Sequence, residues 1–251
     1  MDTSSYARTA TPEKRATAES ARIAGKPIIF SSAMIQALLS NSKSQTRRIL
    51  KPQPQDGAGA PIVFTGDRGE PLFVQFRLAG GDITKSQRLL CAPGDRLFVR
   101  EAWRTEARYD EARPSDLLPP NLARDMRQRA PLVSYEADYT QEPNDGCRGR
   151  LRPSIHMPRW ASRLTLIVEG VKVERLQEIS EADAQAEGIG EPYLGDGDPP
   201  FEERAVMVSR KMQFRNLWRT LHGPDAWDAN PWVAVISFRA VVDNIDTLEA
   251  A

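Results

Sequence analysis

Hydrophobic positions near the start of the chain first form a short run and then take a helical period. The run at 27–30 predicts a strand. A short helix is predicted to begin after Ser31 or Ser32, and Asn41 is its expected end because Asn tolerates the left-handed conformation. The apolar face of this helix is predicted to hold Met34, Ala37, Leu38 and Leu39. A polar stretch at 42–48 follows, so we expect a helix-to-strand junction that displays polar groups.

Later apolar or alternating runs predict further strands. These runs lie at 62–64, 72–76, 96–103, 132–139, 164–176 and 233–242. The turn residues at 66–69 predict a hairpin loop between the first two of these runs. Gly170 is the expected position of a β-bulge in the longest strand.

Two more helices are predicted in the last third of the chain. Ser180, Asp183 and Gly188 have the types and spacing of an N-cap, a capping box and a C-terminal glycine. The strongest amphipathic period spans 202–222. Strands and helices do not alternate, which argues against a doubly wound parallel sheet. The pattern predicts an α+β fold, a mixed β-barrel with short helices at its ends and long loop insertions.

The same pattern predicts how the chain is divided. Residues 1–25 have no sustained apolar period and are expected to form a mobile tail. Residues 26–245 are expected to form a single domain with insertions near 53–92 and 104–131. The first insertion contains the predicted hairpin and is too small for a core of its own. The second is charged and rich in proline, with a possible helix over 121–129.

Charge is balanced overall but uneven along the chain. Lys and Arg number 34, as do Asp and Glu. The segment 146–163 has five arginines and no acid, whereas 178–203 has nine acids and no base. Two interpretations are open: the segments form a dipolar surface, or they are solvated faces that pair with each other.

Few residues of this chain suit a metal or a disulfide. Cys91 and Cys147 make neither a disulfide framework nor a zinc pattern, and His156 and His222 exclude a histidine-rich metal site. The sequence has no apolar run of the about 18 residues that a membrane span needs, and its start lacks the apolar core of a signal peptide. We therefore expect a cytoplasmic protein with no cofactor, no metal and no membrane partner.

Several blocks of the sequence resemble the ASCH family of the PUA-like superfamily. The resemblance rests on 41–48, on 93–101 and on 176–189, together with the closing strand after Trp232. More narrowly, the chain is similar to an uncharacterised branch that is common in phages and prophages. The blocks typical of that branch are 152–163 and 227–232.

The resemblance implies a small β-barrel whose cleft accepts a nucleobase or a nucleic-acid strand. Compact members of the family are amidohydrolases that remove the acetyl group from N4-acetylcytidine. They use a lysine, a threonine three residues later and a glutamate near the end of the short helix, which match Lys43, Thr46 and Glu187. This chain departs from the family in having Asn41 where Gly is common, and in its two large insertions. Other members of the superfamily bind or cut RNA.

Amide hydrolysis would give each of the three matched residues a role. Thr46 is the candidate nucleophile, and Lys43 accepts its proton only if burial or a neighbouring arginine lowers the pKa of the lysine. Glu187 is the candidate that delivers a proton to the leaving amine or orients the base. Each residue also has an ordinary structural interpretation: a solvated lysine at a helix end, a strand threonine and an exposed helix glutamate.

Further residues are candidates for binding the substrate. Arg47 and Arg48 follow the lysine, and aromatic rings are candidate stacking platforms for a base. The full set of substrate-binding candidates is Arg47, Arg48, Arg100, Glu101, Trp103, Tyr135, His156, Arg159 and Trp160. The competing interpretation is that the aromatic rings pack in the core and that the histidine is a hydrogen-bonded structural residue.

Three functions follow from these observations. The first is a hydrolase acting on a modified nucleoside, most simply on an N4-acylated cytosine. The second is a module that binds RNA or single-stranded nucleic acid without chemistry, through the cleft and the 148–163 segment. The third is a ribonuclease. Binding dominated by phosphates weakens steeply with salt, whereas binding of a free nucleoside does not.

Overall fold

The computed structural model describes residues 25–55, 57–65, 72–117, 132–138, 148–190 and 209–248. Four predictions concern residues outside these ranges: the tail over 1–24, the loop at 66–69, the helix at 121–129 and the beginning of the helix at 202–222. The division of the chain into a tail and a single domain stays a prediction.

A five-stranded mixed sheet lies at the centre of the fold, with the order β1-β6-β9-β10-β2. Its strands are β1 (Lys26–Ile29), β2 (Gln45–Ile49), β6 (Arg96–Arg100), β9 (Thr165–Arg175) and β10 (Trp232–Val241). β1 pairs with β6 in parallel, and the other pairs are antiparallel. The register between β9 and β10 shifts next to Gly170, so the predicted bulge is confirmed.

The central sheet is open, so the expectation of a closed barrel is wrong. Closure would require hydrogen-bonded pairing between the first and last strands. Within the described ranges, β1 and β2 are the two edges and do not pair with each other. Instead, the Arg48 guanidinium donates to the Ile29 carbonyl oxygen at 2.8 Å, so one side chain bridges the two edges. Alternation along a strand is the same for a curled sheet and a closed one, which is why the sequence did not distinguish them.

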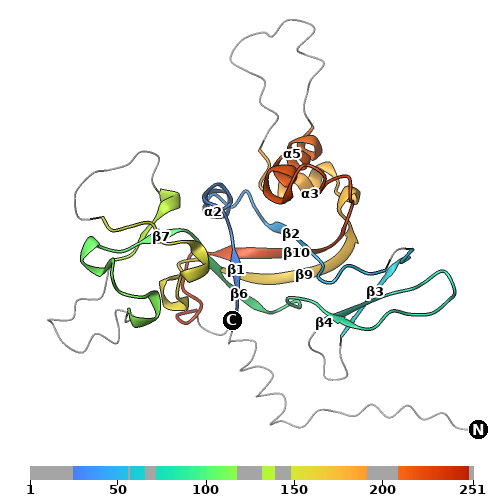
Figure 1. Cartoon of the computed structure of the whole chain (residues 1–251), viewed down its shortest axis with the longest axis horizontal. Coiled ribbons are helices and arrows are strands. Elements are labelled where there is room, and N and C mark those ends of the chain that lie inside the picture. The colour runs from blue at the N-terminus through green and yellow to red at the C-terminus, as the bar shows by residue number, and fades with distance from the viewer. Residues whose placement is uncertain are drawn as a thin grey trace, which may run out of the picture.

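Two smaller sheets flank the central one on opposite sides (Figure 1). One contains β3 (Pro61–Thr65), β4 (Leu72–Phe76) and β5 (Gln87–Arg88), so the predicted hairpin is confirmed and extended by a short strand. It packs on the central sheet through Phe76 and Trp232, whose ring centroids lie 4.9 Å apart. The other sheet pairs β7 (Trp103–Arg104) with β8 (Ser134–Tyr135).

Three α-helices lie along one side of the central sheet (Figure 1). They are α2 (Ser32–Leu39), α3 (Glu181–Ala186) and α5 (Arg210–His222). α2 buries Ile35 and Leu38 against the sheet, so the predicted apolar face was displaced and omitted its most buried residue. α5 buries Phe214 and Trp218 in a second cluster that includes Val233 and Val235 of β10.

Short 3₁₀ helices account for much of the remaining chain. They are η1 (Ala107–Tyr109), η2 (Pro114–Asp116), η4 (Glu136–Asp138), η5 (Ser154–His156), η6 (Arg159–Ala161) and η7 (Leu176–Glu178). Five of these belong to the lobe built around β7 and β8. Its small core contains Trp103, Leu117, Met157 and Ala161. In the part of the chain that is described, no helix is long and apolar enough to cross a membrane.

Candidate functional site

The turn after α2 directs Lys43 into the interior. Asn41 has a φ of 56°, as its predicted role at the end of the helix requires, and the N–H groups of Ser42 and Lys43 both donate to the Ala37 carbonyl. Lys43 then forms an isolated antiparallel bridge with Glu187, next to a hydrogen bond from the Ser44 N–H to the Ala186 carbonyl at 2.8 Å. The side chain of Lys43 is completely buried.

Helix α3 places Glu187 opposite the lysine. Ser180 and Asp183 form both hydrogen bonds of the predicted capping box, and the helix ends at Gly188, whose φ is 89°. A Cβ atom at Gly188 would lie 3.0 Å from the Ala37 Cβ and 3.2 Å from the Lys43 Cβ. Glycine is therefore needed here both for the left-handed backbone and for the close approach of α3 to Lys43.

Lys43 and Glu187 form a buried ion pair. The Lys43 Nζ lies 2.8 Å from the Glu187 Oε2 and also donates to the Glu187 main-chain oxygen at 2.7 Å. The Arg47 Nη1 lies 3.1 Å from the Glu187 Oε1, so the carboxylate has a cationic partner on each oxygen. Lys43 has one carboxylate partner among the described residues, whereas Glu187 has two cationic partners.

Arg47 belongs to an ion-pair network rather than to a free binding surface. Its Nη2 lies 2.7 Å from Glu174 and 3.4 Å from Asp183, and its Nη1 donates to Gln45 at 2.7 Å. Lys172 extends the network through Glu174 at 2.8 Å. Both terminal nitrogens of Arg47 are thus engaged by protein groups, so the side chain holds β2, β9 and α3 together.

The surroundings of Lys43 shift its proton equilibrium. Burial lowers the pKa of Lys43, and the positive charges of Arg48 and Arg47 act in the same direction. Glu187 opposes these effects without cancelling them. The net direction is the one that a lysine acting as a base requires, because only the neutral amine accepts a proton.

A small pocket of about 50 Å³, which we call the inner pocket, opens between β2 and the helices. It is lined by Met34, Thr46, Arg47, Arg48, Glu187, Phe214, Leu217, Trp218, Leu221 and His222. Within the described residues, the Thr46 hydroxyl makes no hydrogen bond and is available to a ligand. The structure thus brings Thr46 and Glu187 to one pocket. Lys43 does not line this pocket but is hydrogen-bonded to the Glu187 carboxylate.

Helix α5 supplies a wall that the sequence did not indicate as part of a site. Trp218 and His222 are four residues apart, and their ring centroids lie 4.3 Å apart. Burial lowers the pKa of His222, and Arg48 and Lys51 lower it further. The spacing of apolar residues along 214–222 predicted a packed helix face, and no local signal distinguished packing on the core from lining a pocket.

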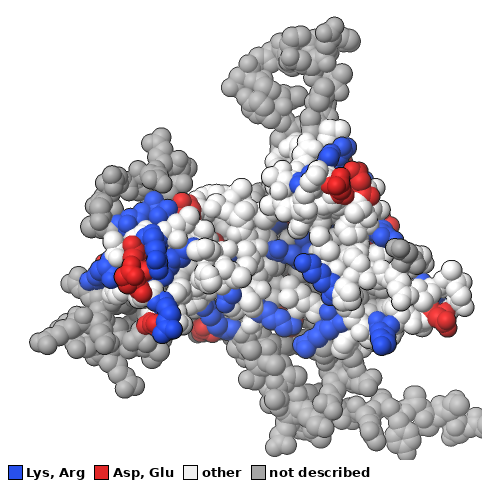
Figure 2. All heavy atoms as spheres, viewed as in Figure 1, with Lys and Arg blue, Asp and Glu red and all other residues white. Residues whose placement is uncertain are grey.

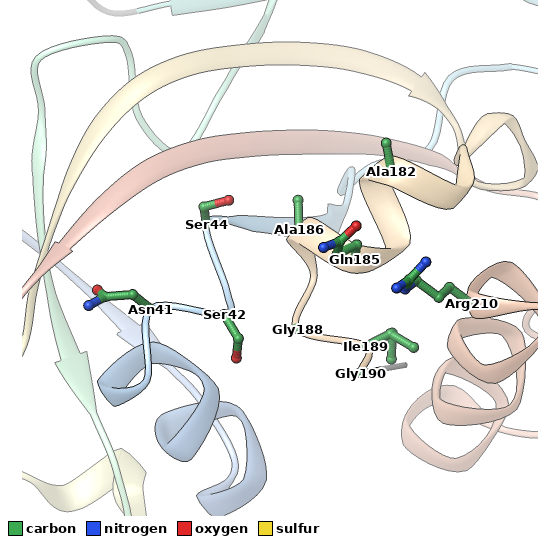
Figure 3. Close-up of a pocket in the computed structure, with 10 residues that line it drawn as sticks. All are labelled: Asn41, Ser42, Ser44, Ala182, Gln185, Ala186, Gly188, Ile189, Gly190 and Arg210. Atoms are coloured by element: carbon green, nitrogen blue, oxygen red, sulfur yellow. The ribbon is translucent and has the colours of Figure 1, made fainter. Parts of the chain in front are cut away.

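A larger pocket of about 440 Å³ lies on the outer side of the Lys43–Glu187 bridge (Figure 3). Ser42 and Ser44 line it from one strand of the bridge, and Ala186 and Gly188 line it from the other. These residues alternate with Lys43 and Glu187, whose side chains point to the inner side. A molecule in this outer pocket would be separated from the Lys43 amine by the main chain of the bridge.

Most of the predicted substrate-binding residues do not line the inner pocket. Of the nine, only Arg47 and Arg48 do so, and Arg48 also lies over the Phe30 ring with its Cζ 5.1 Å from the ring centroid. Trp103 has no exposed surface, so it cannot stack on a base. Tyr135 donates from its hydroxyl to the Ala161 carbonyl at 3.0 Å, and Trp160 packs on the same core as Trp103.

Most charged residues in and beside the lobe built around β7 and β8 form hydrogen bonds or ion pairs with other protein groups. Glu101 is 1% exposed and accepts two hydrogen bonds from Arg163, at 2.9 and 3.0 Å. Burial raises the pKa of Glu101 against the opposing effect of that arginine. Arg100 donates to the Ile155 carbonyl at 3.1 Å, and Arg159 lies 2.6 Å from Asp246. These contacts give Arg100, Glu101 and Arg159 structural roles.

Three of the five arginines in the 146–163 segment have carboxylate partners, so most of the segment is not the free basic surface that its sequence suggested. Arg148 pairs with Glu136 at 2.9 Å, while Arg159 and Arg163 have the acidic partners just described. Positive and negative side chains lie side by side in this lobe (Figure 2). The carboxylates in these pairs belong to Glu101, Glu136, Asp138 and Asp246, which lie outside the described part of the acidic segment, 178–190. His156 is exposed and lies at a separate pocket, far from Lys43 in the chain.

The described residues contain no group of three or more His, Cys, Asp or Glu side chains placed to hold a metal ion. Cys91 is buried, and burial raises the pKa of its thiol to about 12, which makes it unreactive as a nucleophile. Comparison with protein-family models, with curated proteins and with solved structures finds no match for this chain.

Proposed function

We propose that this protein hydrolyses the acyl amide of an N4-acylated cytosine, such as N4-acetylcytidine, with Lys43, Thr46 and Glu187 as its catalytic residues. The observation that carries the proposal is the buried Lys43–Glu187 pair, at 2.8 Å, beside a pocket lined by Thr46, whose hydroxyl forms no hydrogen bond with a described residue. The resemblance of 41–48 and 176–189 to the ASCH amidohydrolases gives the same three residues. The proposal includes a PUA-like fold in which the barrel is left open.

The first step is the attack of the Thr46 oxygen on the acyl carbon. The neutral Lys43 amine takes the hydroxyl proton as the C–O bond forms, which yields a tetrahedral oxyanion. The C–N bond then breaks, and the exocyclic nitrogen of cytosine receives a proton from the Lys43 ammonium or through Glu187. Water hydrolyses the resulting threonine ester, which releases the carboxylic acid and restores the hydroxyl.

We propose a positioning role for Glu187 as well as an acid–base role. Its Oε2 holds the Lys43 Nζ, and its Oε1 is held in turn by Arg47. This second bond fixes the carboxylate and so fixes the direction of the lysine amine. Arg48 and Trp218 line the pocket, and each carries a buried N–H group without a hydrogen-bond partner among the described residues; we propose these two groups as donors to the oxyanion.

The volume of the pocket bears on how the substrate would bind. About 50 Å³ is a few times the roughly 10–15 Å³ that one water needs, so the pocket has room for a small group such as an acetyl. We place the pyrimidine ring outside this space. The ring would therefore lie at the mouth, against Met34 and Leu221, which come from α2 and α5.

The test is release of cytidine from N4-acetylcytidine by the wild type and by Lys43→Ala, Thr46→Ala and Glu187→Ala. Each substitution is expected to lower kcat/KM by a factor of about 100 or more, as for other nucleophiles and general bases. Thr220→Ala is the matched control, since Thr220 is exposed and lies outside the pocket. Activity equal to the wild type in all three pocket variants would rule out this assignment.

Nucleic-acid binding without chemistry is the second candidate function. The observation that favours it is the band of Lys and Arg across the middle of the molecular face in Figure 2. Binding of this kind loses affinity steeply as salt rises. Tight, salt-sensitive RNA binding together with no release of cytidine would support this function, and cleavage of the bound RNA would support a ribonuclease.

A further inference from the structure

A second open pocket, of about 380 Å³, lies in the lobe built around β7 and β8. It is lined by Pro114, Arg150, Leu151, Arg152, Pro153 and His156. Three of these six residues carry basic side chains, and none is acidic. The pocket is formed mainly by the segment that leads into η5, and none of its residues lines the pocket at Thr46.

Arg152 is the unusual member of this group because it is a buried cation that forms no ion pair with a described residue. It is 4% exposed, and within the described ranges no carboxylate lies close enough to form a salt bridge with it. Its Nη1 and Nη2 donate to the carbonyls of Ala112 and Tyr109, at 3.1 and 2.5 Å, and its Nε is buried without a hydrogen-bond partner among the described residues. Buried charges in proteins are normally paired, so this guanidinium lacks a counter-charge.

The neighbouring side chains add positive charge to the same place. Arg150 and His156 are exposed, and neither side chain forms an ion pair or hydrogen bond with a described residue. Asp110 is the nearby carboxylate, and it accepts a hydrogen bond from the Arg150 main-chain N–H at 2.9 Å. Burial lowers the pKa of Arg152 and Arg150 lowers it further, with Asp110 acting in the opposite direction. Burial is the largest of these effects, so the protein interior itself disfavours the uncompensated charge of Arg152.

The other arginines of the segment provide the contrast. Arg148, Arg159 and Arg163 each have a carboxylate within 3 Å. The unpaired positive charge is thus confined to Arg150 and Arg152, beside the pocket. Two exposed apolar side chains, Leu151 at 47% and Ile155 at 59%, lie next to these residues in the chain.

We propose that this pocket binds a phosphate group, and that the group belongs to a single-stranded nucleic acid. A phosphate would supply the missing counter-charge, with Arg150 and His156 as its direct donors. Leu151 and Ile155 would lie against the sugars or bases that flank it, which free phosphate does not offer. The proposal is independent of the amidohydrolase chemistry, because it uses no residue of the inner pocket.

The first arm of the test measures the melting temperature with sodium phosphate or with sodium chloride at equal ionic strength. Phosphate is expected to raise the melting temperature of the wild type, since a ligand that binds the folded state stabilises it. Arg150→Glu is expected to abolish that rise. Arg113→Glu is the matched control, because Arg113 lies in the same lobe, is 82% exposed in its side chain and is not in the pocket.

The second arm measures fluorescence anisotropy with a labelled single-stranded RNA of about 15 nucleotides over a range of salt concentrations. Arg150→Glu should weaken binding by about tenfold or more and reduce the salt slope by about 0.7 for each phosphate that the variant no longer neutralises. His156→Gln should weaken binding less, and Arg113→Glu should leave it within about twofold of the wild type.

Each outcome either supports or overturns the proposal. RNA binding that depends on Arg150, with or without a response to free phosphate, supports the proposal. A response to phosphate without RNA binding overturns the assignment to a nucleic acid and leaves a small-anion site. RNA binding that Arg150→Glu and Arg113→Glu affect equally overturns the pocket as its location. Failure of both ligands to bind overturns the proposal entirely, whether or not the protein releases cytidine from N4-acetylcytidine.

Discussion

Replacing Glu187 should destabilise the protein more than replacing Lys43, although the two form one ion pair. Glu187→Gln leaves the Lys43 ammonium buried with no carboxylate, because Glu187 is its one acidic partner among the described residues. Breaking a buried pair in this way costs about 3–5 kcal/mol. Lys43→Met leaves the carboxylate paired with Arg47 at 3.1 Å. Its main effect is to remove one hydrogen bond to the Glu187 main-chain oxygen, which costs about 1–3 kcal/mol.

The difference should depend on pH in a defined direction. Burial lowers the pKa of Lys43 in the folded state, and removal of Glu187 lowers it further because this carboxylate was raising it. A lysine with a lowered folded-state pKa destabilises the fold fully below that pKa, and the destabilisation disappears as pH approaches the unfolded value of 10.5. The penalty of Glu187→Gln should therefore shrink as pH rises above neutrality.

The assay is urea unfolding of the wild type, both single variants and the double variant at pH 7 and at about pH 9.5. At pH 7 the double variant should be more stable than Glu187→Gln alone, because it no longer buries an unpaired ammonium. A larger destabilisation by Lys43→Met than by Glu187→Gln at pH 7 would refute this reasoning. A penalty of Glu187→Gln that stays constant up to pH 9.5 would refute it equally.

The structure leads to three further expectations. Gly188→Ala should cost about 1–3 kcal/mol in urea unfolding, because the left-handed backbone and the 3.0 Å approach to Ala37 both oppose a Cβ atom, and an unchanged midpoint would contradict this account. Trp103→Ala should cost about 3–5 kcal/mol, since its ring is fully buried; the half-exposed Leu221→Ala should cost much less in the same assay. If Lys43 is the base, kcat/KM for N4-acetylcytidine should rise with pH to a plateau at a pKa below 10.5, and a profile that falls over this range would exclude it.

Sequence patterns predicted the local features that depend on neighbouring residues. The end of α2 at Asn41, the capping box of α3 and the bulge at Gly170 are all present. Each is set by the backbone conformation that a residue type tolerates or by a bond to a residue three positions away. The prediction of the buried face of α2 is less accurate, because Ile35 is fully buried but is not among the predicted apolar residues. Which side of a short helix is covered depends on what packs against it.

The candidate site was only partly predictable. Only the family resemblance connects Lys43 and Thr46 with Glu187, since nothing in the local pattern links residues 144 positions apart. Trp218 and His222 were not predicted as part of the site, because a helix face that lines a pocket has the same apolar period as one packed on the core.

The sequence by itself determined where the helices end, where the long strand bulges and which residue types are available for chemistry. Tertiary structure alone decided that Glu187 meets Lys43, that the sheet stays open and that Trp103 is inaccessible. It also decided that three arginines of a basic segment are neutralised while Arg152 is not. The physical reason is range: backbone preferences and capping bonds act over a few residues, whereas burial and ion pairing depend on segments that the chain brings together only when it folds.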